Sequence, residues 1–335
     1  MPTEVLVTGA TGHVGLALTR ELLDAGYRVR AGTHARKTDR RAEVLRTWGA
    51  TPTHADMLDP ESLALACAGV DAVFHVAGVV RMWAADPERE IIGPNVEGAR
   101  NVVRAAAAAG AKRVILTSSV AAVGAGTTDG RALGPDDWNH DALTPYARAK
   151  TLAELHARLQ ANSDGIELIS ICPGSVIGPG FLTHTPSTEL FSWMLRGLVR
   201  ATLPVSIAYI DCRSLAVLQR AALERGRASA RYIAVDRVAS YDEIARMAAA
   251  ADGSIPVPRW KIHPRMLPAL AVGDAIAAVF SGRDRKITLP MLREFADKHV
   301  FYEVSMTRAD LGWEPRELSD SIAETLNWIR TERLA

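Results

Sequence analysis

The fold is decided by the segment Thr8-Gly-Ala-Thr-Gly-His-Val-Gly15, which continues the apolar run Val5-Leu-Val-Thr8. Its glycines have the spacing G-x-x-G-x-x-G, and the apolar pattern of a helix follows them as far as Ala25. Glycine at such a junction permits a sharp turn and a close approach to the backbone. We therefore predict a strand, a glycine-rich turn and a helix, with backbone N–H groups presented where the helix begins.

The first 180 residues repeat this order of strand and helix. Glycines fall where helices should end, at Gly26, Gly49, Gly69 and Gly110. The alternation predicts an α/β fold, a Rossmann-type doubly wound parallel sheet covered by helices on both faces. We expect strands at 5–8, 28–31, 50–53, 72–76, 113–117 and 167–171, and helices ending at 25 or spanning 41–48, 60–68, 91–109 and 145–161.

After Gly180 the sequence pattern changes, and it indicates longer helices joined by Pro-rich connections. We expect a dinucleotide-binding Rossmann domain over residues 1–180 and a smaller, mixed α/β lobe over 181–335 that is mainly substrate-binding. Two β-rich runs of the second half, near 207–211 and 231–235, are expected to return to the first domain.

Composition excludes several classes of protein. Lys plus Arg (39) balances Asp plus Glu (38) without a basic patch, so we expect no nucleic-acid partner. Neither the three cysteines nor the nine histidines have metal-ligand spacing, so we expect no metal. The longest apolar stretch, 266–280, is shorter than the roughly 20 residues of a membrane span. We expect a cytoplasmic protein without a membrane span, in which that stretch lies on the surface or lines a pocket.

The end of the second expected strand bears on the cofactor. His34, Arg36 and Lys37 follow it, and no acidic residue is present there to hold a ribose 2′-hydroxyl. Basic side chains at this place accept a 2′-phosphate. We predict NADP(H) as the cofactor, with NAD as the alternative. The other interpretation is that these basic residues belong to a solvated loop and bind no cofactor.

Candidate catalytic residues lie in two segments. Tyr146 and Lys150 are four residues apart in an expected helix, so they share one face. A phenol needs a neighbouring positive charge to share its proton near neutral pH. Ser118 and Ser119 directly follow the strand expected at 113–117. A substrate carbonyl could then be held by the hydroxyls of Ser119 and Tyr146. Gly9, His34, Asp56, Gly78, Ser119 and Pro173 each follow a different expected strand and should line one rim of the sheet.

These motifs, in this order, resemble the extended short-chain dehydrogenase/reductase family, in its dihydroflavonol-reductase-like and NAD-dependent epimerase/dehydratase branch. The resemblance covers nearly the whole chain, and rests also on segments 74–78, 81–83, 95–101, 117–119 and 173–180. Gly124, five residues after Ser119, matches the family's spacing and favours Ser119 over Ser118.

The resemblance implies that Tyr146 is the acid/base, that Lys150 lowers its pKa and orients ribose, and that Ser119 polarises the reacting carbonyl. It implies a homodimer formed through the two long helices that contain Asn101 and Tyr146. We further expect substrate contacts from Val80, Trp83, Ser119, Val120, Tyr146, Gly174, Phe181 and Phe191, of which Phe181 and Phe191 are chosen for their apolar character. The cofactor contacts would come from Gly9, Thr11, Gly12, His13, Val14, Gly15, His34, Arg36, Lys37, Asp56, Met57, Val76, Ala77, Gly78, Asn95, Thr117, Tyr146, Lys150, Pro173, Gly174, Ser175 and Val176.

The function predicted from this set is an NADP(H)-dependent oxidoreductase that interconverts a carbonyl and an alcohol on a small, apolar substrate. The alternative within enzymes is a nucleotide-sugar epimerase or dehydratase with tightly bound NAD, for which Arg196, Arg200, Arg213 and Arg259 offer charges for a diphosphate. A redox sensor that only binds dinucleotide is the alternative from another class. Such a sensor could dispense with the tyrosine, so the joint presence of Ser119, Tyr146 and Lys150 argues against it.

Overall fold

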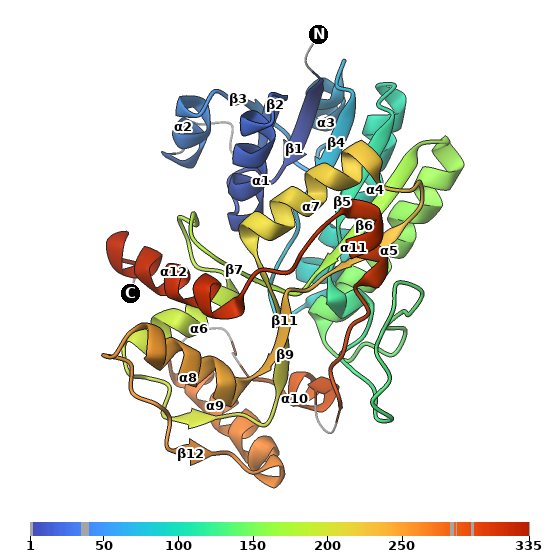
Figure 1. Ribbon diagram of the computed structural model, residues 1–335. Coiled ribbons are helices and arrows are strands. Elements are labelled where there is room, and N and C mark those ends of the chain that lie inside the picture. The colour runs from blue at the N-terminus through green and yellow to red at the C-terminus, as the bar shows by residue number, and fades with distance from the viewer. Residues whose placement is uncertain (1–2, 35–39, 282–284, 286, 296–297, 335) are drawn as a thin grey trace.

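A parallel sheet of seven strands forms the centre of the protein (Figure 1). The computed structural model describes residues 3–34, 40–281, 285, 287–295 and 298–334. Its strands are β1 (Glu4–Thr8), β2 (Arg28–Thr33), β3 (Thr51–His54), β4 (Ala72–His75), β5 (Arg113–Thr117), β6 (Glu167–Pro173) and β10 (Arg231–Ala234). They lie in the order β3-β2-β1-β4-β5-β6-β10, every neighbouring pair parallel. The predicted Rossmann-type fold is confirmed.

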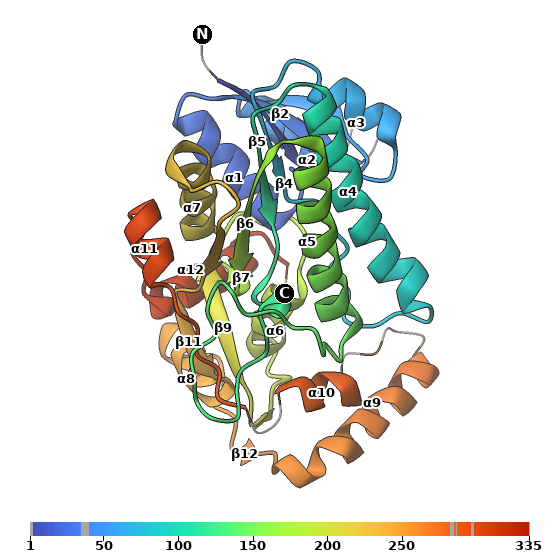
Figure 2. The same ribbon diagram turned by 90° about the vertical axis from the view of Figure 1, so that its right-hand side faces the viewer.

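Two apolar cores fill the space between this sheet and its helices. Side chains alternate between the faces of a strand, so Val5 and Val7 of β1 join one core while Leu6 joins the other. The first core lies under α1 (His13–Asp24), α2 (Arg40–Thr47), α7 (Cys212–Arg225) and α11 (Ser305–Leu311). The second lies under α3 (Pro60–Cys67), α4 (Gly93–Ala108) and α5 (Pro145–Asp164), on the opposite face (Figure 2).

Helix ends follow the sequence signals closely. Gly26, Gly49, Gly69 and Gly110 all have positive φ, as expected for residues that end a helix before a strand. A π-helical turn, Glu88–Ile92, precedes α4 and begins the helix three residues before the predicted start at Ile91.

The second half of the chain builds a smaller lobe around a sheet of three strands. This sheet contains β7 (Ser175–Ile177), β9 (Ser206–Asp211) and β11 (Arg237–Ser240), in the order β11-β9-β7. Helices α6 (Pro186–Leu195), α8 (Tyr241–Ala251) and α12 (Leu318–Thr331) pack against it through a third apolar core. The expected return of two strands to the main sheet is right for β10 and wrong for β9, because β9 pairs with β7 and β11 instead.

Two further helices lie at the end of the molecule away from β1 and β3 (Figure 2). They are α9 (Leu267–Ser281) and α10 (Leu289–Phe295), and near them the short strands β8 (Ala201–Thr202) and β12 (Trp260–Lys261) pair in parallel. None of the helices in the described part of the chain is long and apolar enough to cross a membrane.

Candidate active site

The glycine-rich turn joins β1 to α1 at the carboxyl edge of the sheet. Gly9 has φ +66°, and a Cβ there would lie 2.8 Å from the backbone of Ala77. A Cβ on Gly15 would lie 2.7 Å from the Cα of Ala10, so the helix packs on the strand only because both residues are glycine. Among the described residues, no side chain caps α1 at Gly12. The first amides of α1 are therefore available to an anionic group, which fits the pyrophosphate of a dinucleotide.

The ends of β1 and β4 are tied together beside this turn. The Thr8 hydroxyl accepts hydrogen bonds from the N–H groups of Val76 (3.2 Å) and Ala77 (3.3 Å) and lies 2.9 Å from Nδ1 of His75. Burial and the nearby charge of Lys150 lower the pKa of His75 to about 3. His75 is therefore neutral and serves as a packed, hydrogen-bonded strand residue rather than as a base.

Asp56 and His34 lie at the end of the predicted cofactor site where the adenosine would bind. Asp56 follows β3, and its carboxylate accepts a hydrogen bond from the N–H of Leu58 (2.9 Å) and lies 3.0 Å from Nδ1 of His34. The His34 side chain is 86% exposed and thus available to a ligand. Arg36 and Lys37, predicted to bind the 2′-phosphate, lie outside the described residues.

Hydrogen bonds of Asn95 and Met57 hold the segments that follow β4 and β3. The side chain of Asn95 accepts from the N–H of Val79 (3.1 Å) and donates to the carbonyls of Val79 (3.2 Å) and Ile91 (2.7 Å). With these bonds Asn95 holds the segment after Gly78 in place. The Met57 carbonyl accepts a hydrogen bond from Asn101 of α4 (3.1 Å).

Ser119 and Tyr146 lie at the carboxyl end of β5 and at the start of α5, respectively. Tyr146 lies in the first turn of α5, which Thr144 caps by accepting from the N–H of Ala147 (3.3 Å). Burial raises the pKa of Tyr146, and a hydrogen bond with Ser119 opposes that rise. The adjacent Ser118 instead donates to buried Glu154 (2.6 Å). Ser118 is thus bound to Glu154, which leaves Ser119 as the serine that acts on the phenol.

Lys150 lies one helical turn after Tyr146 on α5. Its Nζ donates to the Thr117 carbonyl at the end of β5 (3.1 Å), and Thr117 Oγ1 accepts from Gln219 (2.8 Å). Burial lowers the pKa of Lys150 to about 8, while Cys172 and Glu154 oppose the shift. An ammonium group whose proton is held this loosely, one turn from a phenol, can take part in proton movement near neutral pH.

Backbone from β6 and β7 forms the next part of the rim. Gly174, between Pro173 and Ser175, donates its N–H to the Ala234 carbonyl (3.0 Å), and a Cβ there would lie 2.6 Å from the Ala208 carbonyl oxygen. The half-buried backbone of 174–176 lies at the carboxyl end of the sheet, on the side away from the adenosine end.

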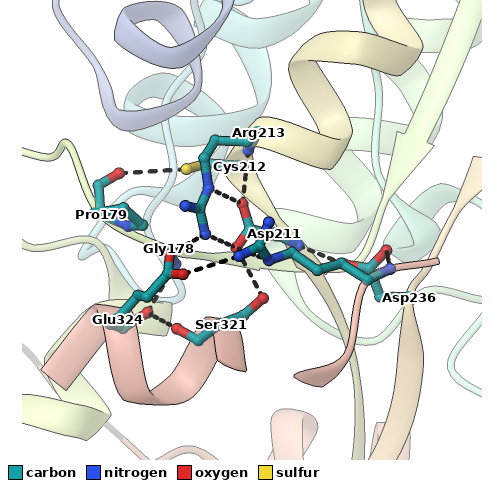
Figure 3. Close-up of polar contacts among 10 residues, drawn as sticks. Gly178, Pro179, Asp211, Cys212, Arg213, Asp236, Ser321 and Glu324 are labelled. Atoms are coloured by element: carbon teal, nitrogen blue, oxygen red, sulfur yellow. Dashed lines mark hydrogen bonds and ion pairs between the residues drawn. The ribbon is translucent and has the colours of Figure 1, made fainter. Parts of the chain in front are cut away.

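A charged network that the sequence did not reveal anchors the loop after β7 (Figure 3). Asp211 is fully buried and accepts from the guanidinium of Arg213 (2.7 and 2.9 Å) and from Ser321 of α12 (2.8 Å). Burial opposes its ionisation, but the Arg213 and Ser321 hydrogen bonds hold the pKa of Asp211 below its usual value. The next residue, Cys212, donates to the carbonyl of Pro179 (3.3 Å). The network therefore fixes the loop that leaves the rim.

The predicted substrate residues fall into two groups. Val80 is exposed, and Trp83 and Val120 are half-buried, so these three can face a ligand. Phe181 and Phe191 have no exposed surface and belong to the core of the second lobe. Phe181 also packs edge-on against the ring of His13, with centroids 5.1 Å apart, so the glycine-rich turn contacts the second lobe directly.

Two long-range contacts, also missed from the sequence, hold the catalytic loops. Arg231 of β10 donates to Glu154 (2.9 Å) and to the carbonyls of Ala122 (3.0 Å), Pro135 (3.0 Å) and Asp137. Its guanidinium also stacks over the ring of Trp138 at 3.8 Å.

The second contact comes from Glu294 of α10. Its carboxylate accepts from the N–H of Thr144 (3.0 Å) and from the side chain of Asn139 (3.0 Å). Thr144 caps the helix that carries Tyr146, so α10 is coupled to the start of α5.

A glycine-rich turn at the first strand of a Rossmann sheet, together with a hydroxyl, a phenol and an ammonium group at its carboxyl edge, defines a nicotinamide-dependent oxidoreductase. Residues 5–214 match the NAD dependent epimerase/dehydratase family. The chain belongs to this family, within the extended short-chain dehydrogenases/reductases, and is an NAD(P)-dependent oxidoreductase of that type.

Individual relatives agree with this assignment. The chain is 33% identical to cinnamoyl-CoA reductase 1 of Oryza sativa subsp. japonica, over 72% of this chain and 74% of that protein. It is 32% identical to dihydroflavonol 4-reductase of Hordeum vulgare, over 72% and 73%. The crystal structure of gox2253 is 28% identical, covers 98% of both chains and superposes with a TM-score of 0.84. The predicted resemblance to dihydroflavonol-reductase-like proteins is confirmed.

Proposed function

We propose that this protein reduces the carbonyl of a small, apolar substrate with NADPH, and catalyses the reverse oxidation under suitable conditions. The observation that carries this proposal is the placement of Tyr146 and Lys150 one helical turn apart on α5, with Lys150 bound to the Thr117 carbonyl at the end of β5, two residues before Ser119. When bound, the nicotinamide supplies the hydride. The names of two relatives, a cinnamoyl-CoA reductase and a dihydroflavonol 4-reductase, agree with reduction.

Each of the three side chains has a separate task in this proposal. A phenol is protonated at neutral pH and burial raises the pKa of Tyr146 further, so Tyr146 can donate a proton to the developing alkoxide. Ser119 donates a hydrogen bond to the same oxygen. Lys150 stabilises the phenolate that results, since its charge is held one helical turn away by the Thr117 carbonyl.

The preference for NADPH rests on the end of β2. The segment 33–38 at this place contains His34, Arg36 and Lys37 and no acidic residue, which favours a 2′-phosphate, and the exposed His34 side chain is paired with Asp56 (3.0 Å). Equal kcat/KM values for NADPH and NADH would contradict this part of the proposal and leave the carbonyl chemistry untouched.

The decisive experiment follows the near-ultraviolet absorbance of NADPH against a panel of aromatic, aliphatic and steroidal ketones and aldehydes. Tyr146→Phe keeps the ring and removes the proton donor, so kcat should fall about 10²- to 10⁴-fold with little change in NADPH affinity. Turnover that survives this substitution undiminished would overturn the assignment of Tyr146.

Epimerisation or dehydration of a nucleotide sugar with bound NAD is the second candidate, favoured by the family match. A diphosphate needs free basic side chains, and Arg213 is already bound by Asp211 (2.7 Å) and Glu324. This observation weighs toward the reductase. Copurified NAD together with conversion of a nucleotide sugar, and no reduction of any carbonyl, would favour the epimerase instead.

A further inference from the structure

Exposed apolar side chains gather in one stretch of the chain. Of the fourteen large hydrophobic side chains exposed among the described residues, six lie between residues 257 and 280. Five of them form what we call the α9 face: Trp260, Met266, Val272, Ile276 and Phe280, which are 74%, 60%, 59%, 54% and 88% exposed. Scattered surface hydrophobics are ordinary, but apolar side chains gathered on one exposed side of a helix mark a binding surface.

The geometry of α9 places three of these side chains together. Val272, Ile276 and Phe280 are spaced four residues apart, so they line one side of the helix. The other side is buried, where Leu267 and Ala271 pack against Leu292 of α10. Figure 2 shows α9 at the end of the molecule remote from the N-terminus, with α10 between it and α5. The helix is therefore apolar on both sides, and the protein covers only one of them.

Positive charge borders the α9 face. Residues 253–295 contain seven Lys or Arg and three Asp or Glu, whereas the whole chain has a net charge of only +1. Arg259, Lys261 and Arg265 are exposed and lie next to Trp260 and Met266 in the sequence, and Lys261 pairs with Asp242 (3.3 Å). The acidic Glu294 is buried, and Asp274 accepts a hydrogen bond from the N–H of Ile287 (3.1 Å). Near the start of α9 the described surface thus carries exposed basic side chains beside apolar ones.

We propose that the α9 face docks on an anionic lipid surface. A helix whose exposed side is apolar, with an exposed Trp and basic side chains nearby in the sequence, can lie in the interface of a bilayer, where the apolar side chains enter the acyl region and the cations meet anionic headgroups. A second copy of the chain fits less well, because a two-fold contact through this face would bring the same basic residues together. The inference goes beyond the proposed reaction, since it concerns where the enzyme binds.

Docking through this face would act close to the candidate active site. The buried carboxylate of Glu294 on α10 accepts hydrogen bonds from Asn139 and Thr144. Thr144 lies only two residues before Tyr146. Because α9 packs on α10, a lipid surface that holds α9 also fixes the orientation of the site relative to the bilayer.

The test is cosedimentation of the full chain with vesicles of phosphatidylcholine alone and of phosphatidylcholine mixed with phosphatidylglycerol. We expect binding to the anionic vesicles, weakened by added salt. The double variant Ile276→Ser/Phe280→Ser should bind about tenfold more weakly. Arg259→Gln/Arg265→Gln should bind more weakly to anionic vesicles only. The matched control Leu65→Ser/Val217→Ser, which removes exposed apolar residues of α3 and α7, should bind like the unmodified protein.

The outcomes separate the occupants of the face. NADPH binding, followed by fluorescence, shows that each variant is folded. Absence of vesicle binding, or equal binding by the Ile276→Ser/Phe280→Ser variant, overturns the proposal. If no protein binds vesicles but Ile276→Ser/Phe280→Ser changes the mass measured by sedimentation, the α9 face is a contact between copies of the chain. That result also overturns the proposal of lipid docking.

Discussion

Lys150 sets the upper end of the pH range at the candidate site. Burial lowers its pKa to about 8, so its ammonium group loses its proton as the pH rises through that value. Without this charge the phenolate of Tyr146 is less stable, and kcat/KM should fall about tenfold for each pH unit above about pH 8. The measurement is the pH profile of kcat/KM for NADPH oxidation.

Lys150→Arg is the control for this profile. A guanidinium stays charged throughout the range, so the variant should be slower at neutral pH and lack the alkaline decline. A native profile that is flat to about pH 10 would show that Lys150 keeps its proton in the working enzyme.

Arg231 positions the loop that carries Ser119. Its guanidinium binds the Ala122 carbonyl, just after the turn begun by Ser119, and two carbonyls of the segment 135–137. A lysine keeps the charge next to Glu154 but cannot reach several carbonyls in one plane. Arg231→Lys should therefore lower kcat with little change in the KM for NADPH, and reduce the free energy of unfolding by about 1–3 kcal/mol.

Arg158 offers a matched comparison, because it also contacts Glu154 (3.3 Å) but otherwise binds Ser170 and the backbone of 229–230. Arg158→Lys should reduce stability in urea unfolding without lowering kcat. Equal effects of the two substitutions on kcat would mean that Arg231 acts through general stability alone.

At this scale the sequence predicts what is local and misses what is long-range. Tyr146 and Lys150 stand out because four residues make one helical turn, and Ser119 because it follows a buried strand. Arg231 contacts groups about a hundred residues earlier, and no spacing in the sequence marks such a pair. Phe181 and Phe191 were predicted as substrate contacts from their apolar character, which cannot distinguish a pocket wall from the core in which they lie.

Among the elements, the contact of α10 with α5 is the one most directly tied to catalysis. Glu294→Ala leaves the buried N–H of Thr144 without its acceptor, at the start of the helix that carries Tyr146. We expect a loss of about 1–3 kcal/mol in the free energy of unfolding and a lower kcat. Urea unfolding and initial rates measure the two effects.

Glu294→Gln is the conservative counterpart. Its amide oxygen can still accept from Thr144, and the Asn139 side chain can turn to suit the new amide. This variant should keep most of the activity. If Glu294→Ala and Glu294→Gln lose kcat equally, the negative charge itself is required and the capping explanation is wrong.

The elements of the first domain follow from periodicity and glycine signals, whereas the partner of a strand does not. β9 and β10 are both short and apolar, and both were expected in the main sheet. Only β10 pairs with β6, while β9 lies between β7 and β11. Pairing depends on the path of the connections and on which edge is free, which are properties of the whole fold.

At the scale of the whole molecule, the two halves meet around the site. The glycine-rich turn touches the second lobe through His13 and Phe181, and the chain returns from that lobe to supply β10 and α11 to the first. The expected domain boundary at residue 180 therefore marks a change in the sequence pattern, but the packing does not divide the chain at that residue.

The association state is the remaining property of the whole molecule that the sequence predicts. We expect a homodimer in which α4 and α5 of two chains form a four-helix interface. These helices pack on one face of the sheet, and Leu159 of α5 is 65% exposed to solvent. A stable contact of this kind buries about 1,600 Å² in total. Sedimentation equilibrium should give about twice the chain mass of 36.1 kDa.

Leu159→Glu tests which surface is used. Two buried carboxylates facing each other across a two-fold axis destabilise the contact, so this variant should sediment as a monomer at micromolar concentration. Leu198→Glu changes a leucine of similar exposure, 58%, just beyond α6 and should leave the dimer intact. A monomeric unmodified protein would refute the dimer itself, whereas a dimer that survives Leu159→Glu would place the contact away from this part of α5.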